Sequence, residues 1–175
     1  LIEPRAPQRH DAIAGLQQTL PRVTLITQNV DDLHERAGSR DVLHLHGSIF
    51  APRCFDCDRP HEFDGAPAMA SEQALEPPRC SYCNGQVRPG VVWFGEALPE
   101  GALDAAFAAA GDCDCLLSIG TSGVVQPAAM IPDLAARRGA TVIHVNPEPI
   151  SVGRANEYSL QGPAGQILPL LLTND

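Results

Sequence analysis

Two Cys-x-x-Cys pairs in the middle of the chain constrain its fold more than any other feature of the sequence. Cys54 and Cys57 form the first pair, and Cys80 and Cys83 form the second. Each pair presents two thiolates to one tetrahedral ion, so the two pairs together complete a closed four-cysteine zinc shell. Because no position is left for water or substrate, the sequence predicts one structural Zn²⁺ ion.

The spacing of these cysteines leaves alternatives open. The four could instead form two disulfides or stay free thiols, and His61 could replace one thiolate. The 22 residues from 58 to 79 slightly exceed the usual zinc-ribbon spacing, and an excursion over 66–78 could fill them. Residues 47–89 are rich in Pro, Cys, Asp and Arg and show little periodicity. We therefore expect an inserted, loop-rich module over 48–89 that a metal stabilises.

Composition narrows the class of protein. At 175 residues, with 44% hydrophobic and 19% charged residues, the chain can bury one core and one smaller appendage. The net charge of −9 repels phosphate backbones, so we expect no nucleic-acid partner. No apolar run approaches the roughly 18 residues of a membrane span, so we expect no membrane partner. Metal-type cysteine spacing favours a reducing compartment, and we expect a cytoplasmic enzyme.

Strand and helix patterns alternate on either side of the cysteine-rich stretch. Apolar, β-branched runs predict strands, and residues at helical spacing predict the helices between them. The expected strands are 23–27, 42–46, 91–94, 115–119 and 141–145, and the expected helices are 9–20, 31–36, 102–110 and 127–138. Such alternation with nearly continuous apolar strands predicts an α/β fold with a parallel sheet that helices cover on both faces.

Polar side chains follow three of the expected strands. Gln28, Asn29 and Asp31 follow the first, residues 120–122 follow the fourth, and Asn146 follows the fifth. Ligands bind beyond the carboxyl ends of parallel strands, so we expect all three groups on one rim of the sheet. The alternative is ordinary turn and helix-cap chemistry, for which Asn, Asp, Ser and Gly are equally suited.

His46 is the candidate acid–base residue. It ends a strand on the expected rim, and an imidazole titrates near neutrality and can accept a proton from a sugar hydroxyl. Gly47 beside it would allow close approach of a ligand. The alternative is a histidine with a purely structural role, and we interpret His44 and His144, inside strands, as packing residues.

In order along the chain come Thr-Gln-Asn-Val-Asp, His-Leu-His-Gly, the two cysteine pairs, Val-Val-Trp-Phe-Gly-Glu, Gly-Thr-Ser and a later Asn. This series resembles the sirtuins, NAD-dependent protein lysine deacylases, from about His10 to Leu172, and the bacterial deacetylase/desuccinylase subgroup (class III) in particular. The resemblance implies a Rossmann-like NAD-binding domain over 1–47 and 90–175, with 48–89 as the inserted zinc module. It also implies removal of acyl groups from protein or peptide lysine side chains, releasing nicotinamide and O-acyl-ADP-ribose. The alternative is a non-catalytic, zinc-stabilised fragment that binds a nucleotide or peptide.

The resemblance also implies a role for each matching residue. His46 is the general base, and Cys54, Cys57, Cys80 and Cys83 bind the structural zinc ion. Three groups of residues bind NAD⁺: Gln28, Asn29 and Asp31 at the nicotinamide and its ribose, Gly120, Thr121, Ser122, Asn146 and Glu148 at the phosphates and adenosine ribose, and Ala164 at the adenine. The substrate backbone pairs with an extended segment made of Val91, Val92, Trp93, Phe94, Gly95 and Glu96.

Two sirtuin features have no counterpart in this sequence. The family begins with a strand and a Gly-Ala-Gly-x-Ser loop, followed by a Gly-Ile-Pro-x-Phe-Arg segment. We therefore expect this sequence to be a fragment of a longer protein, and the fragment alone to bind NAD poorly. The Tyr-x-x-Arg that recognises acidic acyl groups belongs to the same missing part, so the sequence does not predict acyl preference.

Overall fold

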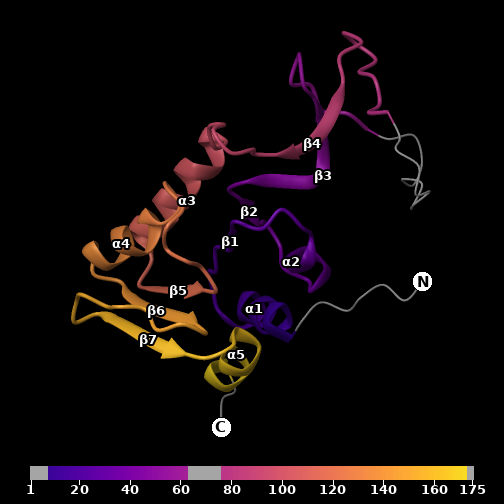
Figure 1. Ribbon diagram of the computed structural model, residues 1–175. Coiled ribbons are helices and arrows are strands. Elements are labelled where there is room, and N and C mark those ends of the chain that lie inside the picture. Colours follow the sequence, from indigo (N-terminus) through magenta and orange to yellow (C-terminus); the bar gives the residue numbers. More distant parts are fainter. Residues whose placement is uncertain (1–7, 63–75, 173–175) are drawn as a thin grey trace.

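The computed structural model describes residues 8–62 and 76–172 of the chain (Figure 1). Most of the expected excursion over 66–78 lies outside these residues. The helices are α1 (Gln8–Thr19), α2 (Leu33–Arg36), α3 (Glu100–Asp112), α4 (Met130–Arg137) and α5 (Ala164–Leu172). The strands are β1 (Ile26–Thr27), β2 (Leu43–His44), β3 (Gly47–Cys54), β4 (Val87–Val91), β5 (Cys115–Ile119), β6 (Thr141–Asn146) and β7 (Glu157–Gln161).

The expected parallel pairing is confirmed, in two separate sheets. β1 pairs with β2 in parallel, and β5, β6 and β7 form a second parallel sheet in that order. The pairing of β6 with β7, like α5, was not predicted, because Glu157–Gln161 carries no long β-branched run and α5 contains Pro169. Proline within an apolar run argues against a helix, yet burial of Leu168 at 0% exposure outweighs this preference.

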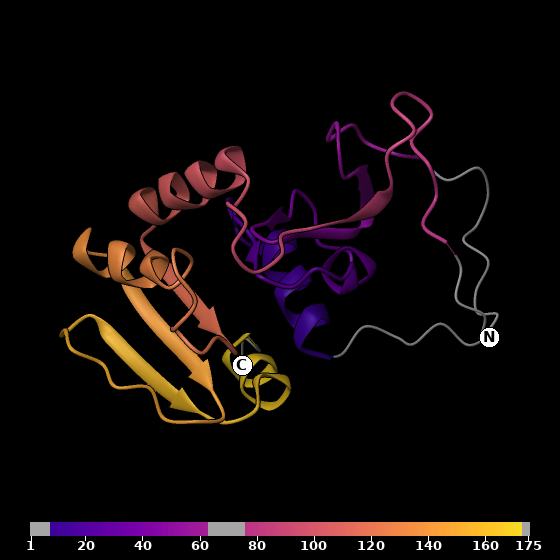
Figure 2. The same cartoon turned by 45° about the horizontal axis from the view of Figure 1, so that its top comes forward.

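Helices cover both faces of the β5–β6–β7 sheet, as expected. On one face, α3 and α4 lie side by side (Figure 2) and pack against Val142 and Leu116. On the other face, α1 and α5 enclose Val145 with Leu168. Neighbouring residues of a strand point to opposite faces, so β6 supplies both clusters.

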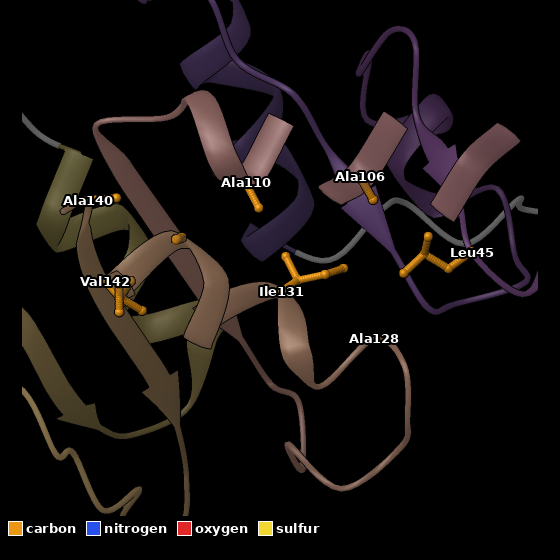
Figure 3. Close-up of a cluster of buried hydrophobic side chains, with 9 residues drawn as sticks. Leu45, Ala106, Ala110, Ala128, Ile131, Ala140 and Val142 are labelled. Carbon is orange, nitrogen blue, oxygen red and sulfur yellow. The ribbon is translucent and has the colours of Figure 1, made fainter. Parts of the chain in front are cut away.

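The larger apolar cluster also joins the two parallel sheets. Leu45, directly after β2, belongs to the same cluster as Ala106 of α3, Ile131 of α4 and Val142 of β6 (Figure 3). Its side chain is only 1% exposed. Packing therefore fixes the stretch that contains His46 relative to the rest of this part of the molecule. We call residues 8–46 and 97–172 the α/β part.

Residues 47–62 and 76–96 form a separate unit, here called the four-cysteine module. We expected loops here, but β3 and β4 form an antiparallel pair with an irregular register between Ser48 and Arg53. Pro and Arg, present in both strands, concealed the strand pattern. In Figures 1 and 2 this module projects away from the β5–β6–β7 sheet.

Two glycines make this strand pair possible. A Cβ on Gly47, whose φ is +72°, would lie 2.1 Å from the carbonyl oxygen of Gly90. One on Gly90 would lie 1.8 Å from the carbonyl oxygen of Ala51. Gly47 thus permits a close approach between strands, which we did not predict, while the approach of a ligand at Gly47 stays a prediction. Gly90 likewise permits the close approach of the two strands.

Element boundaries differ from the expected ones by a few residues. The expected strand 23–27 is reduced to β1, and 42–46 to β2, so, contrary to our expectation, His46 does not end a strand but lies in the turn between β2 and β3. The helix expected over 127–138 begins only at Met130. No helix among the described residues is long and apolar enough to cross a membrane.

Candidate functional site

His46 is held by one hydrogen bond that determines which ring nitrogen carries the proton. Its Nδ1 lies 3.0 Å from the carbonyl oxygen of Gln28, and a carbonyl oxygen can only accept. Nδ1 therefore carries the hydrogen, and in the neutral ring Nε2 is left with a lone pair. The side chain is half-buried. This is the tautomer and the partial exposure that a general base at Nε2 requires.

A second histidine, His44, binds the next residue of the same loop. Its Nδ1 lies 3.2 Å from the carbonyl oxygen of Asn29, and its Nε2 lies 2.7 Å from a carboxylate oxygen of Glu35. We expected His44 to be a packing residue, and that interpretation is incomplete. Consecutive carbonyls of the 28–29 loop are thus fixed by the histidines on either side of Leu45. The pairing of a strand histidine with an acidic helix residue nine positions earlier has no sequence signature.

The other candidates of this loop take part in turns. Asp31 accepts a hydrogen bond from the Leu33 backbone through Oδ1, at 3.2 Å, where α2 begins. The Asn29 backbone N–H donates to the Thr27 hydroxyl at 3.0 Å. Turn chemistry, the alternative left open from sequence, therefore accounts for the backbone shape here. It leaves the Asn29 residue exposed beside His44.

The candidates at the β5–β6–β7 sheet also meet. The Asn146 amide donates to the Thr121 carbonyl at 2.7 Å, and its Oδ1 accepts from the Glu148 backbone at 3.2 Å. Asn146 thus ties the loop after β5 to the loop after β6. Its backbone carbonyl accepts from Gly162, two residues before Ala164. Gly120, with φ of +62°, makes the turn that exposes Ser122.

The structure therefore assembles the predicted residues in two groups. Gln28, Asn29, Asp31 and His46 surround the β1–β2 sheet, and residues 120–122, 146, 148 and 164 lie at the ends of β5, β6 and β7. The expectation that both groups share one rim stays a prediction.

The four sulfurs of the cysteine pairs converge as predicted. All lie within 4.8 Å of one another, with 3.4 Å between Cys54 and Cys83 and 3.8 Å between Cys57 and Cys80. Zn–S bonds of about 2.3 Å in a tetrahedron require sulfur–sulfur distances of about 3.8 Å. All four are free cysteines, which excludes the disulfide alternative for this structure. Backbone N–H groups of Cys83 and Tyr82 lower the pKa of Cys80 to about 7, whereas hydrogen bonds with the Cys54 and Cys57 thiols raise the pKa of Cys83 to about 12.

The expected substrate segment follows β4 and ends in a turn at Phe94 and Gly95. The Val92 N–H donates to the His46 carbonyl at 2.8 Å, so this segment lies directly beside the candidate base. Glu96 forms two hydrogen bonds with Arg88, and this partner holds the pKa of Glu96 at about 2. Arg88 was not predicted, since a lone arginine between Val87 and Pro89 carries no signal of its role.

Burial keeps the remaining histidines of the α/β part apart from this chemistry. His34 packs edge to face on His10, with ring centroids 4.6 Å apart, and burial lowers its pKa. Burial also lowers the pKa of His144, which is 9% exposed. The interpretation of His144 as a packing residue is confirmed.

Comparison with known proteins now settles the family. A family profile described as the Sir2 family matches residues 3–127. The chain belongs to the Sir2 family. Within that family it is 61% identical over 165 residues to NAD-dependent protein deacylase 1 of Pseudomonas aeruginosa, covering 93% of this chain and 66% of the relative. It is 54% identical over 167 residues to an NAD-dependent protein deacylase of Methylococcus capsulatus, covering 93% and 65%. The chain thus spans just under two thirds of the length of these relatives.

Solved Sir2 structures share the fold. A Sir2 homologue in complex with NAD superposes with a TM-score of 0.85 at 43% identity, over 96% of this chain and 64% of the other. A Sir2 protein bound to an acetylated peptide superposes with a TM-score of 0.81 at 28% identity, over 94% of this chain and 68% of the other. The α/β architecture with a separate four-cysteine lobe is therefore the Sir2 architecture.

Proposed function

We propose that this chain carries the base, the metal module and part of the nucleotide site of an NAD-dependent protein lysine deacylase. One observation supports the chemistry above all others, the hydrogen bond from His46 Nδ1 to the Gln28 carbonyl at 3.0 Å. This hydrogen bond holds Nδ1 of His46 against the 28–29 loop, so the lone pair of Nε2 points away from that loop. That nitrogen accepts a proton from a ribose hydroxyl, and general-base assistance of this kind contributes about 10²–10⁴-fold in rate.

The donor set of the two loop groups fits NAD. Amide and carboxylate groups of Gln28, Asn29 and Asp31 suit a carboxamide and a ribose. Gly120, Thr121 and Ser122, tied to Asn146, offer backbone N–H and hydroxyl groups to phosphates, and Glu148 offers a carboxylate to a ribose. Ala164 would contact the adenine. When bound, NAD supplies the ribose that accepts the acyl group, with nicotinamide as leaving group.

The segment from Val91 to Glu96 is the proposed docking strand for the substrate. Its β4 end is paired with β3, and Trp93 and Phe94 are 47% and 107% exposed. An extended peptide can add to such a segment through main-chain hydrogen bonds. We propose an acyl-lysine protein or peptide as its partner, since a Sir2 relative is bound to an acetylated peptide.

The four cysteines are the proposed zinc ligands. Their sulfur spacing fits a tetrahedral ion, and no ligand position remains for substrate, so the ion has a structural role. We further propose that residues 48–89 form the metal unit within a nucleotide-binding domain of residues 1–47 and 90–175. A cytoplasmic location, consistent with free cysteines, completes the proposal.

Nicotinamide release from acetyl-lysine and succinyl-lysine peptides tests the proposal. It is measured with the 175-residue chain and, in parallel, with the longest protein that its gene encodes. His46→Ala is expected to lower the rate about 10²–10⁴-fold without changing the circular dichroism spectrum. His61→Ala, a histidine of the four-cysteine module, is the matched control and is expected to retain the rate.

Two results would contradict this function. One is the absence of nicotinamide release from the longer protein, and the other is equal activity of His46→Ala and the control. If NAD or peptide binds without any turnover, the molecule is instead the non-catalytic binding module considered from sequence.

A further inference from the structure

Arg88 is the most deeply buried charged side chain of the four-cysteine module among the described residues. Its side chain is 8% exposed, and a buried guanidinium requires several acceptors. Nη1 donates to Glu96 Oε1 at 2.5 Å, and Nη2 donates to Glu96 Oε2 at 3.0 Å and to the Val91 carbonyl at 2.7 Å. Such two-point pairing fixes both position and orientation of the acceptor.

These contacts hold the whole segment from Val91 to Glu96. Arg88 binds the backbone carbonyl of Val91, the first residue of the segment, and the carboxylate of Glu96, its last residue. The same carboxylate accepts the Trp93 backbone N–H at 2.9 Å. The guanidinium also lies 3.5 Å from the centroid of the Trp93 ring, a cation–π contact. A single side chain therefore determines the start, the middle and the end of the segment.

Arg88 also lies close to the first cysteine pair, the knuckle formed by Cys54 and Cys57. Phe55, between Cys54 and Cys57, lies with its ring 5.7 Å from the guanidinium and 6.0 Å from the Trp93 ring. Arg88 also follows Val87, which pairs with Cys54 in register and is buried against Cys54 and Cys80. The position of Arg88 thus depends on the geometry of the knuckle.

We propose that Arg88 couples the four-cysteine site to the segment from Val91 to Glu96, so that metal binding preorganises this segment for a peptide. Arg88 is a positioning residue, because it acts through Glu96, Val91 and Trp93 and not on reacting atoms. The peptide part rests on the proposed function, whereas the coupling itself does not. An ordered strand gives up less conformational entropy when a peptide pairs with it, so metal-loaded protein binds peptide more tightly.

The single tryptophan of the chain makes the coupling measurable without any turnover. Trp93 is that residue, so intrinsic fluorescence reports directly on the Arg88 contact. We expect removal of Zn²⁺ from the full chain with a chelator to shift Trp93 emission to longer wavelength and to increase quenching by acrylamide. Adding Zn²⁺ back should reverse both changes.

Two substitutions separate coupling from general loosening. Arg88→Lys keeps the charge but loses the planar, two-point contact, so emission should resemble the metal-free state and respond little to Zn²⁺. Arg59→Lys is the matched control, since Arg59 lies in the same module but stacks on Tyr82, 3.2 Å from its ring centroid. It should respond to Zn²⁺ as the unmodified chain does.

Should Arg88→Lys fail to bind one Zn²⁺, Glu96→Gln replaces it, because Glu96 lies outside the strand pair. The coupling is wrong if Trp93 emission of the unmodified chain is the same with and without Zn²⁺. It is equally wrong if the Arg88 or Glu96 variant that binds zinc responds to Zn²⁺ as fully as Arg59→Lys does.

Kinetics of the longer protein test the peptide part. Arg88→Lys should raise KM for an acyl-lysine peptide about 10-fold, which corresponds to about 1.4 kcal/mol, with kcat and KM for NAD unchanged. An unchanged peptide KM overturns this part. If no variant or parent releases nicotinamide, the proposed function fails, while the fluorescence response still decides the coupling.

Discussion

The four-cysteine module and the α/β part lie in one chain but are stabilised differently. In the α/β part, two clusters of buried apolar side chains pack between helices and strands. In the described residues of the module, the buried cluster consists of Cys54, Cys80 and Val87, with Cys57 beside it. So small a core cannot offset the entropy of ordering the module, and a metal must supply the difference. Metal removal and core truncation should therefore damage different halves of the molecule.

Loss of one metal ligand should have the largest effect. Cys80→Ser removes a thiolate from a site whose zinc binding, in small zinc modules, is worth about 10–16 kcal/mol. We expect the bound zinc to fall from one equivalent to a small fraction, and the module to become sensitive to protease while the α/β part keeps its helices. Zinc content and the pattern of limited proteolysis measure the two effects.

Cys115→Ser is the matched control for that experiment. Cys115 is a free, exposed cysteine of β5 and is absent from the four-cysteine cluster. It should keep one equivalent of zinc. Full zinc binding by Cys80→Ser, or collapse of the α/β helices together with the module, would contradict the division between the two parts.

Truncation of a core side chain in the α/β part should have the opposite effect, so that the α/β part is destabilised while zinc stays bound. Leu168 of α5 is 0% exposed and packs with Ile13 of α1 and Val145 of β6. Leu168→Ala should lower the free energy of unfolding by about 2–5 kcal/mol through lost burial and a residual cavity. Leu171→Ala, at a position 42% exposed in the same helix, should change it by under about 1 kcal/mol.

Urea unfolding followed by circular dichroism measures both variants, and zinc content is measured beside it. Leu168→Ala should keep its zinc. Equal destabilisation by the two leucine variants would show that α5 does not carry the core that we assign to it.

The same contrast explains which features could be predicted from the sequence. Cysteine spacing is a local signal, and strands such as 115–119 carry continuous apolar runs, so the cysteine cluster and the parallel strands were predicted. Contacts that join distant segments were not. Glu35 with His44 and Arg88 with Glu96 pair charged residues whose neighbours carry no common pattern. β3 was missed because Pro and Arg interrupt its alternation, and the contact of Gly47 with Gly90 was missed because the two lie far apart along the chain.

The hydrogen bond between His44 and Glu35 allows a smaller effect to be tested, close to the point where the α/β part continues into the four-cysteine module. β2 leads directly into β3, so a loosened His44 should disturb the 28–29 loop before it disturbs either core. Glu35→Gln removes the charge from a bond of 2.7 Å, and hydrogen bonds to charged groups contribute about 1.5–3 kcal/mol. Because Glu35 is 42% exposed, we expect an effect toward or below the lower end of that range.

Amide hydrogen exchange of residues 28–30 measures this loosening. Asp32→Asn is the control, since Asp32 precedes the same helix and its side chain makes no capping hydrogen bond. In a double-mutant cycle, Glu35→Gln and His44→Gln should be coupled by at least about 0.5 kcal/mol. Additive effects would mean that the two side chains are neighbours without a significant interaction.

The smallest effect on stability is expected for Arg22 and Asp112, an ion pair of the α/β part. It joins the same residue classes as Arg88 and Glu96, an arginine and a carboxylate, but it is exposed to solvent. Arg22 and Asp112 lie 2.8 Å apart, but their side chains are 71% and 73% exposed. Water and salt screen such a pair, so Asp112→Asn should cost about 0–1 kcal/mol, and the cost should disappear at 1 M salt. Denaturant midpoints at 0.1 M and 1 M salt measure it. A loss above about 2 kcal/mol that persists at high salt would mean that ion pairs contribute to both parts alike, and the contrast between a metal-dependent module and a core-dependent α/β part would no longer hold.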